Sequence, residues 1–212
     1  MTILRSIMAV GAIGGLAAAC AAGSVQPPVL TYANQGCAAA ADLMTAVSLT
    51  PPRERAVHVV AVPVDTSTPC LNRSGPTPYV VYQLPADLGD KTVTVGSMLE
   101  ATRIFAPEVA VLDGRGMVTR TFAREEYHYR GGHYSVQFRP RDEEAYVLVS
   151  ADPALVGQRY DSIMIGTTTT SVYTGGGGVS WTSGVDNSQS RTFSYEGTVQ
   201  VLVNDTDTEE GR

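Results

Sequence analysis

Two histidines and two glutamates lie close together in the middle of the chain, and these side chains could bind a metal ion. His128 and His133 follow Glu125 and Glu126 within a few positions. A zinc site needs three or four ligands held at fixed positions, whereas Gly131-Gly132 makes the intervening segment pliable. We therefore expect a solvated loop here and no metal site.

The sequence contains no arrangement typical of catalysis. Serines are frequent, but no Gly-x-Ser-x-Gly nucleophile motif is present. Glu125-Glu126 and Glu143-Glu144 are adjacent pairs, and neighbours on a strand point to opposite faces, so neither pair suits glycoside hydrolysis. The four glycines at 175–178 are not followed by Gly-Lys-Ser/Thr, as a phosphate-binding loop requires. We predict no catalytic residue, no cofactor and no enzymatic activity.

Aromatic residues offer a different chemistry, because the apolar face of a sugar ring can stack on an aromatic ring. Tyr127, Tyr129 and Tyr134 cluster around a Gly-Gly turn, and Trp181 lies in a Gly-rich segment. Tyr127 and Tyr129 share one face if their segment is extended. We name Tyr127, Tyr129 and Trp181 as possible sugar-stacking residues. The alternative is that these rings pack in the sheet, where tyrosine is common.

The N-terminus has the pattern of a secretory signal. Arg5 precedes residues 7–19, which carry no charge and are too few to span a membrane. Residues 16–20, Leu-Ala-Ala-Ala-Cys, resemble the lipobox of bacterial lipoproteins, in which the cysteine is acylated. We expect a signal peptide at 1–19, lipidation of Cys20 and anchoring to the outer membrane, since Ala21 and not Asp follows. Cleavage by an ordinary signal peptidase after a small residue is the alternative.

The other two cysteines, Cys37 and Cys70, form an even pair in a chain expected to reach an oxidising compartment. We predict a disulfide between them, which would stabilise the fold by roughly 3–4 kcal/mol in the entropic model. Two buried free thiols are the alternative. Zinc binding is not expected, because neither cysteine belongs to a C-x-x-C pair.

Composition narrows the possible partners and the fold. The formal charge of −6 becomes −7 when Arg5 is removed with the signal, so nucleic acid is excluded as a partner. Charged residues make up 17% of the chain, and 21 Gly and 12 Pro indicate many turns. This profile is typical of a β-rich secreted domain.

The hydrophobic pattern divides the chain beyond the expected signal into three parts. Residues 20–55 read as a tether with one possible short helix at 38–47. From 56 to 204 the apolar period is two, which predicts strands. Residues 167–190 form a flexible loop or an extended hairpin within this part, and 205–212 an acidic disordered tail. The strand candidates are 57–64, 79–84, 91–99, 107–112, 117–122, 134–139, 146–150 and 198–203.

Turn residues separate these strands. Asp113-Gly114 lies between two alternating apolar runs and marks a hairpin. No segment after residue 50 has helical periodicity over three turns. We predict an all-β fold, an antiparallel β-sandwich or jelly-roll-like single domain with an N-terminal tether.

Several of these stretches resemble the maltose operon periplasmic protein family. The closest stretch is 104–113, with Phe-Ala-Pro before an apolar strand that ends in Leu-Asp. Further similar stretches are Gly75-Pro76, Tyr82-Gln83-Leu84-Pro85-Ala86, Leu88-Gly89, Thr92-Val93-Thr94-Val95, Glu144-Ala145-Tyr146-Val147-Leu148-Val149 and Ser194-Tyr195-Glu196-Gly197-Thr198-Val199. The resemblance implies a periplasmic β-sandwich linked to maltodextrin uptake, and it transfers no functional residue.

The leading hypothesis is a non-catalytic periplasmic accessory protein of maltose or maltodextrin transport, with maltodextrin or an outer-membrane sugar porin as partner. The rival is an envelope scaffold or assembly lipoprotein that binds an outer-membrane protein. A polysaccharide-active enzyme is least favoured. An exposed aromatic platform would favour sugar binding, whereas an unpaired apolar strand edge would favour a protein partner.

The lipobox-like segment leads to a first prediction. Replacing the expected acylation site, in Cys20→Ser, should move the protein from the membrane fraction to the soluble periplasm, as measured by fractionation and immunoblotting. Wild-type protein found entirely in the soluble fraction would instead indicate ordinary signal cleavage.

Overall fold

The structure is a computed structural model, and it describes residues 25–34, 36–53, 56–73, 75–174 and 177–205. For 162–168, 172–174, 177–179 and 181–188 the description is limited to the backbone. Within these ranges the chain is built almost entirely from strands, with two 3-10 helices, η1 (Leu43–Thr45) and η2 (Arg124–Glu126). The predicted all-β fold class is confirmed.

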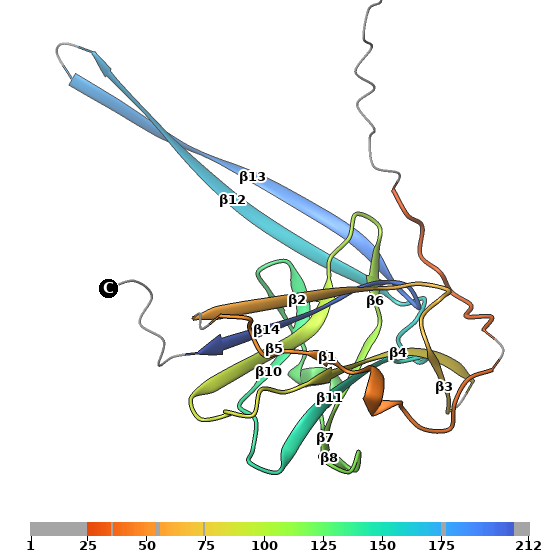
Figure 1. Cartoon of the computed structure of the whole chain (residues 1–212). Helices are drawn as coiled ribbons and strands as arrows, with labels where there is room; N and C mark the ends of the chain where they lie inside the picture. The colour runs from red at the N-terminus through yellow and green to blue at the C-terminus, as the bar shows by residue number, and fades with distance from the viewer. Residues whose placement is uncertain (1–24, 35, 54–55, 74, 175–176, 206–212) are drawn as a thin grey trace, which may run out of the picture.

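Two large sheets lie over one another and form an open sandwich (Figure 1). The first has the order β1-β4-β11-β7-β8, with β3 beside β4. Its strands are β1 (Val47–Ser48), β3 (Cys70–Asn72), β4 (Pro76–Gln83), β7 (Pro107–Asp113), β8 (Val118–Thr121) and β11 (Glu144–Ala151). The second has the order β2-β14-β5-β10-β9. Its strands are β2 (Val57–Val64), β5 (Lys91–Met98), β9 (His128–Arg130), β10 (His133–Phe138) and β14 (Gly197–Asp205).

The main core lies between the two sheets and consists largely of β-branched residues. Because side chains alternate along a strand, every second residue of each central strand points inward. The second sheet contributes Val93, Val95, Val136, Val199 and Val201, and the first contributes Val109, Val111, Val147 and Val149, all essentially inaccessible to solvent. The period of two seen in the sequence is therefore the period of burial in this core.

The outer face of the first sheet is also covered. Its buried residues include Tyr79, Leu112 and Leu148, and the partly buried Ala41 and Leu43 of the N-terminal segment pack against them. Leu49 is completely buried in the main core, and β1 pairs in parallel with β4. The domain thus has a third, partial layer built from residues that precede β2.

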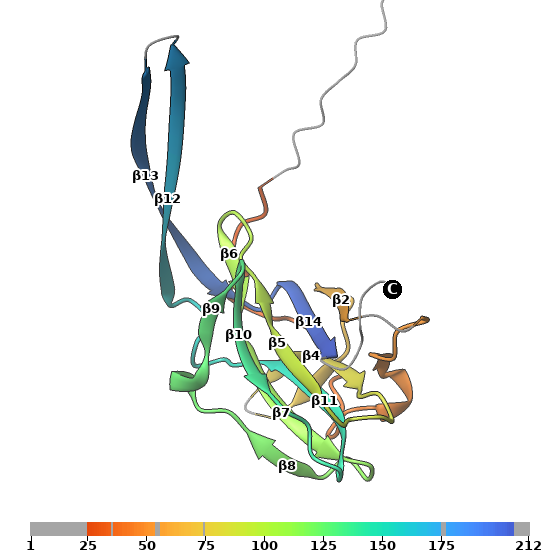
Figure 2. The ribbon, with the colours of Figure 1, turned by 90° about the vertical axis from the view of Figure 1, so that its left-hand side faces the viewer.

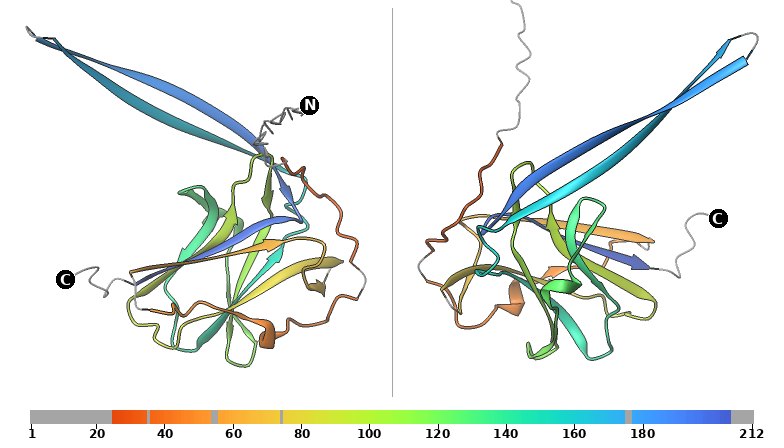
Figure 3. Two further views of the ribbon diagram at one scale, coloured as in Figure 1. Left: turned by 45° about the horizontal axis from the view of Figure 1, so that its top comes forward. Right: turned by 180° about the vertical axis from the view of Figure 1, so that it is seen from behind.

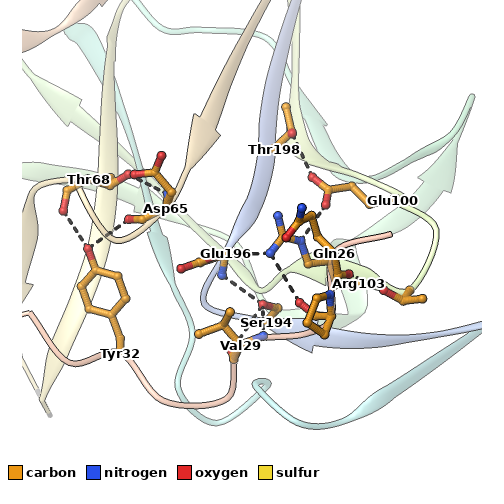
Figure 4. Close-up of polar contacts among 12 residues, drawn as sticks. Gln26, Val29, Tyr32, Asp65, Thr68, Glu100, Arg103, Ser194, Glu196 and Thr198 are labelled. Carbon is orange, nitrogen blue, oxygen red and sulfur yellow. Dashed lines mark hydrogen bonds and ion pairs between the residues drawn. The ribbon is translucent and has the colours of Figure 1, made fainter. Parts of the chain in front are cut away.

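Further upstream, residues 26–32 run along the domain surface as a strap (Figure 4). The Val29 N–H donates to Ser194 Oγ at 2.8 Å, and the Tyr195 N–H donates to the Val29 carbonyl at 2.9 Å. The Tyr32 hydroxyl donates to the Thr68 carbonyl at 2.7 Å. The described part of the segment predicted as a tether is therefore held against the body, because its backbone and side chains find partners there.

A third sheet, with the order β12-β13-β6, contains a long hairpin (Figures 1 and 2). Strands β12 (Arg159–Thr174) and β13 (Gly177–Ser194) pair without a register shift, from Arg159 opposite Thr192 to Thr174 opposite Gly177. Strand β6 (Arg103–Phe105) pairs in parallel with the last three residues of β13. The hairpin projects far beyond both sheets in every view (Figure 3). The extended-hairpin reading of residues 167–190 is the one that the structure adopts.

All eight strand candidates correspond to strands, and the hairpin marked by Asp113-Gly114 joins β7 and β8. The sequence reading missed β1, β3, β6 and β9, which have only two or three residues and no room for a period. Within the possible helix at 38–47, only η1 forms.

A buried ion pair joins β8 to β11. The Glu144 side chain is fully buried at a bulge in β11, and its Oε2 lies 2.6 Å from Arg120 Nη2. The carboxylate also accepts hydrogen bonds from the Thr119 hydroxyl and the Arg141 N–H. The Arg120 guanidinium lies 4.8 Å from the centre of the Phe138 ring. This pair attaches β8, the outer strand of the first sheet, to β11.

We expect Arg120→Leu to lower the free energy of unfolding by about 3 kcal/mol, because it leaves a buried carboxylate without its cation. Urea denaturation followed by circular dichroism measures the change. Arg73→Leu is the matched control, since Arg73 and its partner Glu108 are both about half exposed, and its effect should stay below about 1 kcal/mol. Equal losses of unfolding free energy in the two variants would contradict the conclusion that the buried Arg120–Glu144 pair stabilises the fold.

Candidate functional site

Tyr127, one of the three named aromatics, is a core residue. It follows η2, is 8% exposed, and its ring stacks on Tyr134 with centroids 5.3 Å apart. Its hydroxyl accepts a hydrogen bond from the Val109 N–H at 2.9 Å. Burial raises the pKa of Tyr127 above its ordinary value. The structure therefore corrects the expectation of an open stacking surface at Tyr127: both ring and hydroxyl are engaged in the protein.

The other two aromatics lie apart. Tyr129, on β9 directly opposite Tyr134, is 39% exposed and is the more accessible ring of the cluster. Trp181 lies opposite Thr170 in the hairpin, and its side chain is outside the described part of the structure. The hairpin base is at Tyr160 and Arg191, so a rise of roughly 3.3 Å per residue places the Trp181 backbone about 30 Å farther out. The three residues do not form one platform.

Cys37 and Cys70 are joined by a disulfide with an S–S distance of 2.03 Å. Beside it, the Ala38 N–H donates to the Cys70 carbonyl at 2.8 Å. The bond fixes the N-terminal segment to β3. Cys20, the expected lipidation site, lies outside the described residues, as does the acidic tail at 206–212.

The histidines serve different parts of the fold. His58 is partly buried on β2. His128 is exposed on β9. His133 Nδ1 lies 3.2 Å from the Arg130 carbonyl, and its Nε2 contacts Gln200 of β14. Among the described residues, no group of three or more histidine, cysteine, aspartate or glutamate side chains could hold a metal ion.

A concave surface lies where β7 begins and β11 ends. Two adjoining hollows, of about 100 and 310 Å³, share Glu108 and Asp152 in their walls. Strand β7 positions Glu108, and Asp152 directly follows β11. The smaller hollow is lined by Pro107, Glu108, Phe122, Arg124, Tyr127, Tyr134, Asp152 and Leu155, and the larger by Arg73, Thr77, Glu108, Ala151, Asp152, Pro153 and Ala154.

Two ion pairs organise this double hollow. Arg73 Nη1 lies 3.0 Å from Glu108 Oε2, which also accepts a hydrogen bond from the Ser150 hydroxyl at 3.2 Å. Arg124 Nη2 lies 3.2 Å from Asp152 Oδ2, and the Ala154 N–H donates to Asp152 Oδ1 at 2.8 Å. Each carboxylate is therefore held in place by an arginine and a neutral donor. Both pairs remain partly exposed, so their atoms can exchange partners with a ligand.

The double hollow combines the groups that recognise polyhydroxylated ligands. Its carboxylates accept hydrogen bonds, its guanidinium groups donate them, and the partly buried Phe122 supplies apolar surface beside the buried rings of Tyr127 and Tyr134. Sequence reasoning missed Glu108, Asp152, Arg73 and Arg124 because their pairing joins positions far apart in the chain. The only local signal was the proximity of Glu108 and Asp152 to prolines at strand ends.

The fold and the double hollow define an all-β, sandwich-like protein with a polar concave surface at its strand ends. The model of one family, described as maltose operon periplasmic protein precursor (MalM), matches residues 74–149 of the 212-residue chain. The resemblance predicted from the sequence is confirmed over that segment, which runs from β4 to β11. The description of that family names a periplasmic protein of a maltose operon.

Searches of curated proteins and of solved structures found no significant match. Among the described residues, no helix has the length and apolar character needed to cross a membrane.

The difference in burial between Tyr127 and Tyr129 leads to a prediction. Tyr127→Ala should lower the free energy of unfolding by about 3–5 kcal/mol, because it opens a cavity beside Tyr134 and removes a buried hydrogen bond. Tyr129→Ala, in the same cluster but half exposed, should cost no more than about 1 kcal/mol. Thermal or urea unfolding of both variants measures the difference. A stable Tyr127→Ala protein would show that the ring is not a core element.

Proposed function

We propose that the protein is a non-catalytic periplasmic accessory protein of maltose or maltodextrin transport. The observation that carries this proposal is the match of the maltose operon periplasmic protein family to residues 74–149, which contain strands of both sheets. Binding without turnover is the simplest role for a double hollow that holds two carboxylates already paired with arginines. In this role the protein holds a sugar or a partner protein near the transport machinery.

The double hollow at Glu108 and Asp152 is the proposed sugar site. Carboxylates and arginines are suited to hydrogen bonding with sugar hydroxyls, and Tyr134 and Phe122 border the same space. Its larger part, about 310 Å³, is at the small end of ligand pockets. With few stacking contacts and partly exposed ion pairs, the dissociation constant for a maltodextrin should be in the millimolar to high-micromolar range.

Attachment to the outer membrane through a lipid on Cys20 is part of the same proposal. The lipobox-like sequence at 16–20 supports it. The strap at 26–32 would leave only a few residues between such a lipid and the body, because the Gln26 carbonyl already accepts a hydrogen bond from the Thr102 hydroxyl. The body would therefore be kept close to the membrane surface.

A second candidate function is an envelope scaffold that binds an outer-membrane protein, and one observation favours it. Strand β2 is an outer strand of the second sheet, with β14 as its paired neighbour. Val57 and Val59 on this strand are 45% and 46% exposed. An apolar strand edge of this kind suits pairing with a strand of another protein. An enzyme acting on polysaccharide is the least favoured function.

Calorimetric or NMR titration with maltotriose tests the sugar-binding proposal. The double variant Glu108→Gln and Asp152→Asn should weaken binding at least tenfold, because it removes both charged acceptors. Glu143→Gln, at an exposed carboxylate outside both hollows, is the matched control and should bind as wild type does. No reducing ends should be released during long incubation.

Absence of sugar binding, together with capture of a defined outer-membrane protein from intact envelopes, would support the scaffold instead. Capture that increases when maltodextrin is added would favour the transport role. Release of reducing ends by wild-type protein, abolished in the double variant, would contradict the non-catalytic proposal.

A further inference from the structure

The hairpin of β12 and β13 has no packing role in the sandwich over most of its length. Beyond its base, where β6 pairs with Thr192–Ser194, the described strands give it no further sheet neighbour. Residues 162–174 of β12 and their partners in β13 form a two-stranded ribbon. At roughly 3.3 Å per residue this ribbon is about 45 Å long. We call residues 162–189 the arm.

A two-stranded ribbon presents two edges of backbone N–H and C=O groups, and it is marginally stable alone in water. One edge of the arm is formed by β12 and the other by β13. Along the described strands, each has its hairpin partner on one side and open sheet edge on the other. The arm is therefore a template to which a further strand can be added by main-chain hydrogen bonds.

The composition of the arm indicates which partner it accepts. Natural edge strands avoid self-pairing mainly by carrying charged residues, lysine above all. The arm carries a single charged residue, Asp186 in β13, and residues 162–174 of β12 carry none. The rest of the chain is acidic, with a net charge of −6 overall. Charge is therefore concentrated on the body, where it repels other copies. It is absent from residues 162–174 of β12, where pairing with an identical edge would occur.

The base of the arm is held firmly enough to carry such a contact. The guanidinium of Arg103, on β6, pairs with Glu100 at 2.7 Å and with Glu196 at 3.2 Å (Figure 4). Glu196 directly precedes β14, and Glu100 also accepts from the Thr198 hydroxyl at 2.9 Å. These contacts join β6, which pairs with the last three residues of β13, to the start of β14 in the second sheet.

We propose that the arm is a self-association element, in which the edge of β12 that faces away from β13 pairs antiparallel with the same edge of a second copy. An antiparallel pair of identical strands has a two-fold axis, so the contact closes as a dimer. The product is a four-stranded sheet made of two hairpins, with the two acidic bodies held apart at its ends. The contact needs neither a sugar nor a lipid, and it is independent of the proposed transport role.

Sedimentation equilibrium of purified protein carrying Cys20→Ser tests this proposal without any contribution from an acyl chain. We expect a reversible monomer–dimer equilibrium. Replacing Thr168 and Thr170 by lysine should raise the dissociation constant of the dimer at least tenfold, since it brings four like charges to the paired edge. Replacing the same two residues by valine, an uncharged strand former, should leave the dimer intact or strengthen it.

Trp181 provides a second measurement, because it is the single tryptophan of the chain and lies within the arm. Its fluorescence emission should change with protein concentration in the wild-type and valine proteins and should stay constant in the lysine protein. The unfolding midpoint of the body should be the same in all three, which excludes a general folding defect.

A wild-type protein that remains monomeric up to several hundred micromolar overturns the proposal. So does a dimer that persists in the lysine variant, which would place the contact elsewhere, for example at the edge of β2. If only phosphatidylcholine vesicles change the Trp181 emission of a monomeric protein, the arm binds lipid and not a second copy.

Discussion

The contact between two valine-lined sheet faces is the interaction on which the rest of this structure depends. Val93, Val95 and Val201 on one sheet meet Val109, Val111 and Val147 on the other. Side chains branched at Cβ fill a narrow interlayer space with few accessible rotamers, so the two sheets are held in a defined relation. The ends of β7 and β11, which carry Glu108 and lead to Asp152, belong to the same strands as this core. The packing between the two sheets therefore fixes the positions of Glu108 and Asp152 in the double hollow.

Around this core, the sequence predicted those parts of the fold that are encoded by local patterns. Alternation along 57–64 and 91–99 identified β2 and β5, and Asp113-Gly114 identified a turn, because both signals arise from neighbouring residues. The layer formed by Ala41 and Leu43 was not predicted, since its burial depends on Leu112 and Leu148, which are distant in the chain. The strap was missed for the same reason: Val29 has its partners at Ser194 and Tyr195.

The candidate site was predictable only in part. Aromatic clustering around Gly131-Gly132 was visible in the sequence, and two of these rings, Tyr127 and Tyr134, line the smaller hollow. Which ring would be buried depended on whether β7 offered Tyr127 a backbone donor, and the Val109 N–H does so. The arginine–carboxylate pairs were invisible, because Arg73 and Arg124 reach their partners only after β4, β7 and β11 have been brought together.

The place of β14 has a consequence for how the chain is made. This last strand lies between β2 and β5, and its valines complete the core of the second sheet. Because a chain is synthesised from its N-terminus, β2 and β5 are made long before the strand that lies between them. Until residues 197–205 have followed, β2 and β5 both lack the strand with which they pair in the complete sheet. A chain interrupted shortly before β14 would therefore expose an open, valine-rich sheet to proteases and to aggregation.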